Sequence, residues 1–77
     1  MWTIISRDNC PHCENAKELL TSLGHHYTEH NLETNSSKWV LSLMKEANLK
    51  TVPQVFNHYG TRVGGYSELR ELLVKGY

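Results

Sequence analysis

The residues best suited to chemistry are the only two cysteines of the chain, Cys10 and Cys13, which are separated by two residues. They occur where a strand-like run gives way to a helix-like one. Pro11 suits the first position of a helix, because its missing N–H would have no intrahelical partner there. Cys10 would then cap the helix, where unpaired N–H groups and the helix dipole favour thiolate over thiol. The motif therefore predicts a thiol-disulfide redox centre.

The spacing also predicts a separate role for each cysteine. Cys10 would be the exposed nucleophile that forms a mixed disulfide, and Cys13, one helical turn further in, the less accessible thiol that resolves it. A bridge over so short a loop removes little entropy from the unfolded chain, which favours a catalytic disulfide over a structural one. His12 has two open interpretations, either a surface side chain or a group that tunes the Cys10 thiolate when protonated.

The composition excludes several classes of protein. The chain has 77 residues with eight basic and eight acidic side chains, so a basic surface for nucleic acid is not expected. The first six residues have no basic start and lead directly into Arg7 and Asp8, which fits neither a secretory signal nor a membrane span. We expect one domain, residues 1–77, in a cytoplasmic monomer that binds neither nucleic acid nor membrane.

The first half of the chain predicts a strand, a helix and a second strand. Residues 2–6 are suited to a short buried strand. Residues 11–23 form a helical pattern that ends at Gly24, and its apolar stripe consists of Ala16, Leu19, Leu20 and Leu23. Residues 25–32 roughly alternate, which favours a second strand. A βαβ unit of this kind has parallel strands and a right-handed crossover.

The second half predicts a helix, a hairpin and a last helix. Residues 35–37 offer caps for a helix that ends near residue 48 or 49. Residues 51–56 and 61–63 are expected to pair as a hairpin, with Pro53 at an edge or an exposed end of the sheet. Ser67 is expected to cap the last helix, which has Gly76 near its end. Trp2 and Trp39 are expected to be core or half-buried packing residues, although an exposed Trp39 could rest against a partner.

The predicted order β-α-β-α-β-β-α, with the two cysteines at the first strand-to-helix junction, indicates a thioredoxin-like fold. This is an α/β architecture with a four-stranded mixed sheet flanked by three helices.

Three separated motifs together resemble glutaredoxins over essentially the whole chain. They are Cys10–Cys13 with the helical residues 16–20, then Thr51–Pro53, then Gly64–Tyr66. The resemblance implies a cytosolic, glutathione-dependent enzyme that needs no metal. Cys10 would attack a protein disulfide or a glutathione mixed disulfide, Cys13 would complete the dithiol route, and glutathione would serve as the reducing co-substrate.

The resemblance also implies where glutathione binds. Arg7 stands where the family usually has a lysine for the glycine carboxylate, and the Val52–Pro53 bond is expected to be cis, which turns the Val52 backbone toward Cys10. Departures from the family pattern are His12, in place of a usual tyrosine, and Ser67, where aspartate is common. The residues that the resemblance assigns to glutathione and substrate are Arg7, Thr51, Val52, Pro53, Gly65, Tyr66 and Ser67.

Several alternatives remain open. The chain is short, as are some viral and bacterial glutaredoxins that serve ribonucleotide reductase. Another alternative is that thioredoxin reductase, and not glutathione, returns the oxidised protein to its dithiol form. A zinc module is the non-enzymatic alternative, because Cys10, Cys13, His26 and His30 have the spacing of a two-Cys, two-His finger. Against zinc, both histidines follow the helix instead of lying on it. An iron-sulfur cluster would require a dimer or glutathione thiols.

Overall fold

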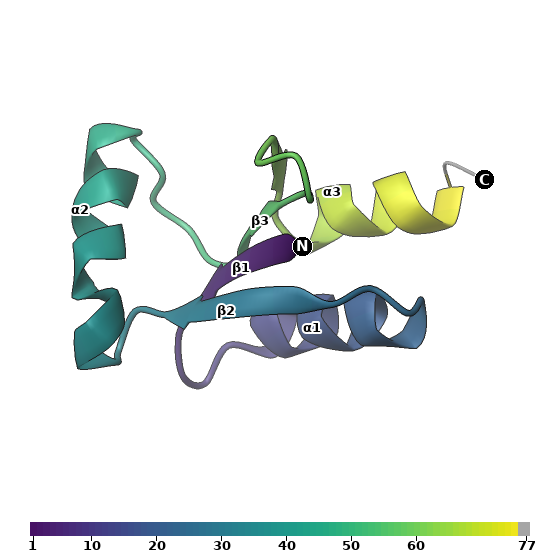
Figure 1. Cartoon of the computed structure of the whole chain (residues 1–77), viewed down its shortest axis with the longest axis horizontal. Helices are drawn as coiled ribbons and strands as arrows, with labels where there is room; N and C mark the ends of the chain where they lie inside the picture. Colours follow the sequence, from purple (N-terminus) through teal and green to yellow (C-terminus); the bar gives the residue numbers. More distant parts are fainter. Residues whose placement is uncertain (76–77) are drawn as a thin grey trace.

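The computed structural model describes residues 1–75, and their secondary structure follows the predicted order (Figure 1). A short 3₁₀ helix, η1 (Asn35–Ser37), precedes α2, and a π-helical turn, η2 (Glu71–Lys75), continues α3. Gly76, expected near the end of the last helix, lies outside the described residues. The strands and α-helices are β1 (Trp2–Ser6), α1 (Pro11–Ser22), β2 (Tyr27–Asn31), α2 (Lys38–Glu46), β3 (Gln54–Phe56), β4 (Arg62–Gly64) and α3 (Tyr66–Arg70).

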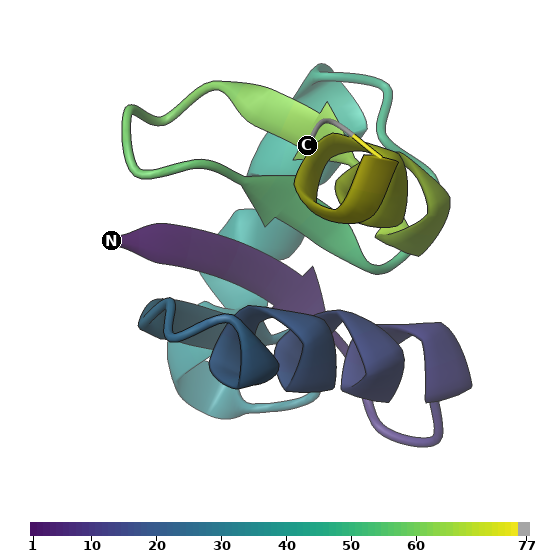
Figure 2. The same ribbon diagram turned by 90° about the vertical axis from the view of Figure 1, so that its right-hand side faces the viewer.

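The four strands form one mixed sheet in the order β2-β1-β3-β4. Strand β1 pairs with β2 in parallel and with β3 antiparallel, and β3 pairs with β4 antiparallel. Helices α1 and α3 lie in front of the sheet in Figure 2, whereas α2 lies behind it. The predicted four-stranded mixed sheet with three flanking helices is therefore confirmed.

Two apolar clusters hold the helices to opposite faces of the sheet. Successive side chains of a strand point to opposite faces, so Ile4 packs toward α1 and α3 while Ile5 packs toward α2. The cluster on the α2 side consists of Ile5, Val40 and Met44. The cluster on the other side consists of Trp2, Ile4, Ala16, Leu20, Val55, Leu69 and Leu73. Both clusters fix β1, whose carboxyl end leads directly into the cysteine motif.

The C-terminal end of the first helix differs slightly from the prediction. Leu23 is the C-cap residue of α1 and is 46% exposed, so it does not extend the buried stripe. Gly24 has a φ of +80°, the left-handed conformation that commonly ends a helix. The predicted stop is confirmed, but the apolar face ends one turn earlier than expected.

The two tryptophans have different environments. Trp2 is 6% exposed in the larger cluster, as predicted, whereas Trp39 is 57% exposed, so the structure favours the exposed environment over packing in the core. Val40 and Met44 occupy the buried face of α2, and a residue one position before Val40 is rotated by about 100° around the helix axis. The Trp39 side chain is therefore largely exposed, and its ring lies 5.7 Å from that of His30 on β2.

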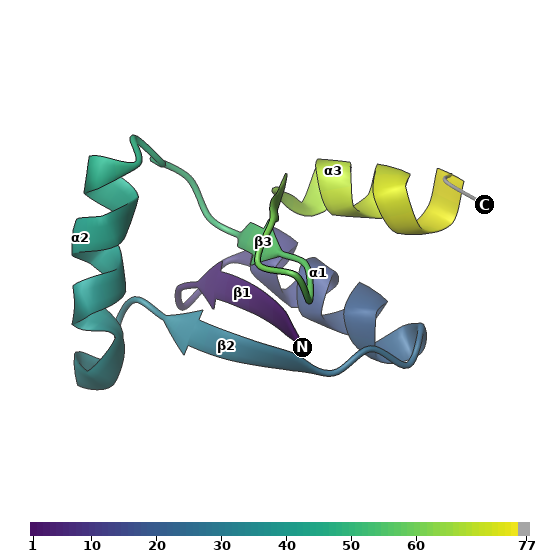
Figure 3. The same cartoon turned by 45° about the horizontal axis from the view of Figure 1, so that its top comes forward.

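The chain returns to the sheet later than predicted, and Pro53 is not at an edge. Residues 47–53 carry the chain from α2 back to the sheet, and β3 begins only at Gln54 (Figure 3). Pro53 is buried directly before a central strand, where its missing N–H costs no ladder hydrogen bond. No helix among the described residues is long and apolar enough to cross a membrane.

Candidate active site: a disulfide at the start of helix α1

Cys10 is the N-cap residue of α1, as the sequence predicts. Its backbone is extended, with φ −121° and ψ 96°, and Pro11 follows at the start of the helix. The Cys10 sulfur accepts a hydrogen bond from the Cys13 N–H at 3.2 Å. Negative charge on the Cys10 sulfur is therefore stabilised by a backbone donor and by the positive end of the helix dipole. Both favour the thiolate once the bond to Cys13 is reduced.

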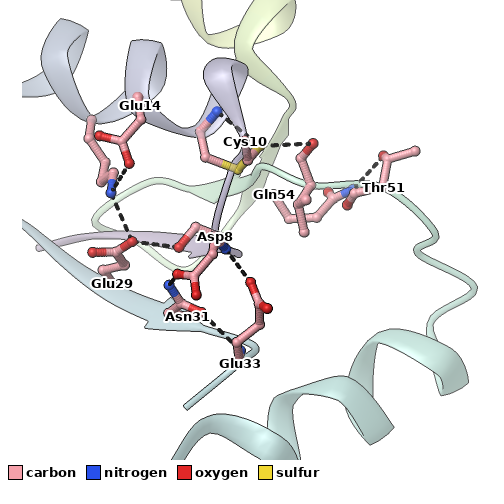
Figure 4. Close-up of a disulfide and its surroundings, with 12 residues drawn as sticks. Asp8, Cys10, Glu14, Glu29, Asn31, Glu33, Thr51 and Gln54 are labelled. Atoms are coloured by element: carbon pink, nitrogen blue, oxygen red, sulfur yellow. Dashed lines mark hydrogen bonds and ion pairs between the residues drawn. A yellow bond between two sulfur atoms is a disulfide. The ribbon is translucent and has the colours of Figure 1, made fainter.

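The two cysteines form a disulfide, with their Cα atoms 5.2 Å apart (Figure 4). Cys13 is fully buried, whereas Cys10 is partly exposed. A disulfide is broken when a thiolate attacks one of its sulfurs, and access decides which sulfur is attacked. In this arrangement Cys10 is the sulfur that an incoming thiol or disulfide can reach.

The Thr51–Pro53 segment lies next to the Cys10 sulfur. The Val52–Pro53 peptide bond is cis, as the resemblance implied. The carbonyl oxygen of Val52 lies 4.0 Å from the Cys10 sulfur, and Figure 4 shows the segment beside the disulfide. A backbone segment at this distance can pair with the backbone of an extended substrate next to its sulfur.

Gln54 is a residue of the site that sequence reasoning missed. It is only 4% exposed, and its side-chain Nε2 donates to the Thr51 carbonyl oxygen at 2.9 Å and to the Thr51 hydroxyl at 3.2 Å. Arg62 Nη1 donates to Gln54 Oε1 at 3.1 Å. Because Arg is only a donor, it selects the amide oxygen and leaves the NH₂ group for Thr51. The available signal was a polar residue inside an apolar strand, directly after the proline.

The Gly64–Tyr66 motif lies beside the same segment. Gly64 has a φ of +126°, and a Cβ there would stand 2.7 Å from Glu68 Oε1, so only glycine fits. A Cβ on Gly65 would be 3.6 Å from the carbonyl oxygen of Pro53. The third motif is therefore packed against the second.

The start of α3 differs from the prediction. Gly65, not Ser67, is the N-cap residue, and Ser67 is an exposed residue inside the first turn. The cap is supplied by Glu68, whose carboxylate accepts a hydrogen bond from the Gly65 N–H at 2.6 Å. The prediction for Ser67 fails because a glutamate three residues after the cap satisfies the free N–H group at this end of the helix.

His12 connects the cysteine motif to the third motif. Its side chain is exposed, and its ring stacks on that of Tyr66 with a centroid distance of 6.1 Å and an interplanar angle of 25°. Arg7 lines a groove with Cys10, Thr51 and Val52. Of the residues that the resemblance assigned to glutathione, Arg7, Thr51 and Val52 thus lie beside Cys10, and Tyr66 stacks on His12 of the cysteine motif.

A charged cluster ties α1 to the sheet behind the disulfide. Lys17 Nζ lies 2.8 Å from Glu14 Oε1 and 3.0 Å from Glu29 Oε2, and the Ser6 hydroxyl donates to the same Glu29 oxygen at 2.5 Å. The hydrogen bond to Glu14 raises the pKa of Lys17, while burial opposes this and Glu29 reinforces it. Burial pushes the pKa of Glu29 upward, but hydrogen bonds from Ser6 and Lys17 outweigh it and lower the pKa.

The structure does not assemble the zinc ligands of the alternative hypothesis. The carbonyl of His26 accepts from the N–H of Trp2, at the start of β1, whereas Cys10 follows the far end of that strand. Five residues of strand span about 16 Å, too far for a shared ion. Within residues 1–75, no three His, Cys, Asp or Glu side chains are close enough together to hold a metal.

A disulfide that caps a helix, opposite a cis-proline segment of this mixed sheet, defines the class of thioredoxin-like thiol-disulfide oxidoreductases. A family model described as Glutaredoxin matches residues 2–59. Glutaredoxin 3 of Escherichia coli strain K12 is 33% identical over 73 residues, which cover 95% of this chain and 86% of the relative. The chain therefore belongs to the glutaredoxin family, whose members are disulfide oxidoreductases.

Solved glutaredoxin structures agree with this assignment. The buckwheat glutaredoxin-glutathione complex superposes with a TM-score of 0.81 at 26% identity, covering 97% of this chain and 69% of that one. The dithiolic glutaredoxin of Trypanosoma brucei brucei gives a TM-score of 0.82 at 27% identity, covering 97% of this chain and 78% of that one. The fold expected from the sequence is thus the fold of the family.

Proposed function

We propose that this glutaredoxin uses glutathione to reduce protein disulfides and glutathione mixed disulfides. The observation that carries the proposal is the asymmetric disulfide, with Cys10 partly exposed at the helix cap and Cys13 fully buried behind it. The likeness to a buckwheat glutaredoxin solved in complex with glutathione supports the choice of co-substrate.

The proposed reaction is two successive thiol-disulfide exchanges. The Cys10 thiolate attacks one sulfur of the substrate disulfide, forms a mixed disulfide and releases the other sulfur as a thiolate, which takes up a proton. Cys13, after losing its proton, attacks the Cys10 sulfur and releases the second substrate thiol. Two electrons pass from the cysteine pair to the substrate. Two glutathione molecules then reduce the pair and leave as glutathione disulfide.

Glutathione is proposed to lie across the disulfide, held from both sides. Arg7 is suited to its glycine carboxylate, since a guanidinium binds a carboxylate through a bidentate fork. The backbone of Thr51, Val52 and Pro53 would pair with its middle, next to the Cys10 sulfur. Gly65, Tyr66 and Ser67 would receive its γ-glutamyl end, where glycine allows close backbone approach.

The cellular setting is part of the same proposal. A catalytic disulfide of this kind functions where thiols are kept reduced, so we propose a cytoplasmic location. We also propose that the protein is a monomer formed by a single domain. Ribonucleotide reductase is proposed as one protein partner.

Turnover with glutathione and glutathione reductase, compared with turnover with thioredoxin reductase, tests how the protein is recycled. Activity with thioredoxin reductase alone would contradict the proposal.

Substitution of each cysteine tests the two roles. Cys10→Ser should abolish reduction of both protein disulfides and glutathione mixed disulfides, because it removes the attacking thiolate. Cys13→Ser should keep reduction of a glutathionylated peptide, because free glutathione can attack the disulfide between Cys10 and glutathione and leave as glutathione disulfide. It should lose most reduction of a two-cysteine peptide disulfide, which needs the resolving thiol. Both substrates are assayed at matched glutathione concentrations. Equal losses in the two variants would contradict the assigned order.

A further inference from the structure

The groove beside Cys10 carries a local positive charge. It has a volume of about 630 Å³ and lies between the Cys10 loop, the Thr51–Val52 segment and α2. Within residues 1–75, its charged lining residues are Arg7, Lys45 and Lys50, with no aspartate or glutamate among the lining residues. Since the chain as a whole has equal numbers of acidic and basic residues, this concentration of cations is a property of the groove. It favours an acidic ligand.

The same groove has an apolar side that glutathione does not need. Leu32, Leu41, Met44 and Leu49 line it alongside the three cations. Glutathione has two carboxylates but no aliphatic or aromatic side chain, so its binding would leave this apolar surface in water. A ligand that covers it must bring an apolar side chain of its own.

We propose that this groove docks the segment that carries the disulfide of a protein substrate, and that this segment has acidic and aliphatic side chains next to its cysteine. The inference rests on the proposed disulfide reduction and names its substrate class. The acidic side chains face Arg7, Lys45 and Lys50, while the aliphatic one covers the leucines. The substrate cysteine then meets Cys10 at the end of the groove. Reduction follows the two exchanges given above and needs no other reactant.

Single-turnover reduction of designed peptides tests the inference without any recycling system. Three cyclic peptides, each closed by one internal disulfide, differ only in the residues that flank one of the two cysteines. These flanking residues are two Glu and a Leu, two Lys and a Leu, or two Glu and a Ser. The prereduced protein is mixed with each peptide, quenched with acid and analysed by mass. We expect the Glu-Leu peptide to react roughly three- to tenfold faster than the Lys-Leu peptide. The difference should shrink in about 0.5 M salt.

Three variants of α2 locate the effect. Lys45→Glu should slow the Glu-Leu peptide and speed up the Lys-Leu peptide, a gain that misfolding cannot produce. Lys38→Glu makes the same charge change at the other end of α2, at a residue that does not line the groove, and should leave the ratio of the two rates nearly unchanged. Leu41→Ser should remove the advantage of the Glu-Leu peptide over the Glu-Ser peptide. Leu41 is 41% exposed, so the fold tolerates this change.

The remaining outcomes decide against the inference. Equal rates for the Glu-Leu and Lys-Leu peptides would overturn it while leaving disulfide reduction intact. Equal rates for the Glu-Leu and Glu-Ser peptides would mean that the groove recognises only charge, as it would for a small carboxylate such as glutathione, and would also overturn peptide docking. Failure to reduce any of the peptides would contradict the proposed function itself.

Discussion

At the scale of single residues, environment separates two identical side chains. Cys10 has a backbone donor at 3.2 Å and partial access to solvent, whereas Cys13 is enclosed. Thiolate character rises near helix N-termini and falls in apolar surroundings. The same logic applies to Gln54, a buried amide that donates two hydrogen bonds to Thr51, in the segment that faces Cys10, and accepts one from Arg62.

Gln54 is predicted to position the backbone of Thr51 and Val52. Gln54→Leu should lower kcat/KM for a glutathionylated peptide about five- to tenfold, because the lost hydrogen bonds are worth about 1 kcal/mol each and free the segment. The alkylation rate of reduced Cys10 should stay the same, since the cap of α1 is untouched. Gln54→Glu keeps an acceptor for Arg62 but cannot donate to Thr51. If Gln54→Glu retained full activity, the hydrogen bonds to Thr51 would not be the cause.

At the scale of elements, charge and hydrogen bonds attach α1 to the sheet near the active site. Lys17 on α1 bridges Glu14 of the same helix and Glu29 of β2, and Ser6 at the end of β1 adds a hydrogen bond to Glu29. These contacts hold the helix in place directly after the cysteine motif. Their contribution to stability depends on the ionisation of Glu29 and Lys17.

The lowered pKa of Glu29 predicts a specific loss of stability in acid. A carboxyl with a depressed folded-state pKa stabilises the fold above its unfolded pKa, about 4.3 for Glu. That contribution is lost as the pH falls through the folded value. The raised pKa of Lys17 acts in the opposite range, because its contribution is complete below about pH 10.4 and is lost only at higher pH.

Glu29→Gln tests this prediction by urea unfolding at pH 7 and at pH 3.5. The variant should be less stable than the parent at pH 7, and this deficit should be smaller at pH 3.5, below the ordinary pKa of a glutamate side chain, because protonation of the parent carboxyl weakens its contacts. Glu18→Gln, an exposed change on α1, serves as the control and should show little difference at either pH. A Glu29→Gln deficit of the same size at both pH values would contradict an electrostatic role.

At the scale of the whole molecule, the sheet separates two apolar clusters of unequal size. The larger cluster joins β1, α1, β3 and the last helix, and the smaller one joins β1 to α2. A domain of this size has little stability to spare, so the larger cluster is expected to decide whether the site is assembled at all. The smaller cluster supports the groove beside Cys10.

The last helix offers a matched pair for this prediction. Leu69 is fully buried in the larger cluster, whereas Leu72, three residues later, is 49% exposed. Leu69→Ala should cost about 2–5 kcal/mol of unfolding free energy, through lost burial and the cavity left behind. Leu72→Ala should cost no more than about 0.5 kcal/mol. Thermal and urea unfolding measure both free-energy losses. A Leu69→Ala loss as small as that expected for Leu72→Ala would show that α3 does not pack through Leu69.

Sequence patterns and the family resemblance were enough to predict the order of the elements, the position of the cysteine pair and the cis-proline segment. These depend on local patterns, namely apolar periodicity, a proline after the cap and glycine at a helix end, together with the family motifs. The confirmed stop at Gly24 and the burial of Trp2 are of this kind.

The hydrogen bonds and surfaces that distant residues share could not be predicted from local patterns and became evident from the folded chain. The exposure of Trp39, the Glu68 cap in place of Ser67, the Gln54 contacts and the groove that joins Arg7 to Lys45 all depend on how elements meet in space. The physical reason is that periodicity specifies which face of a helix or strand is apolar. It does not specify which donor lies near which acceptor once those faces are packed.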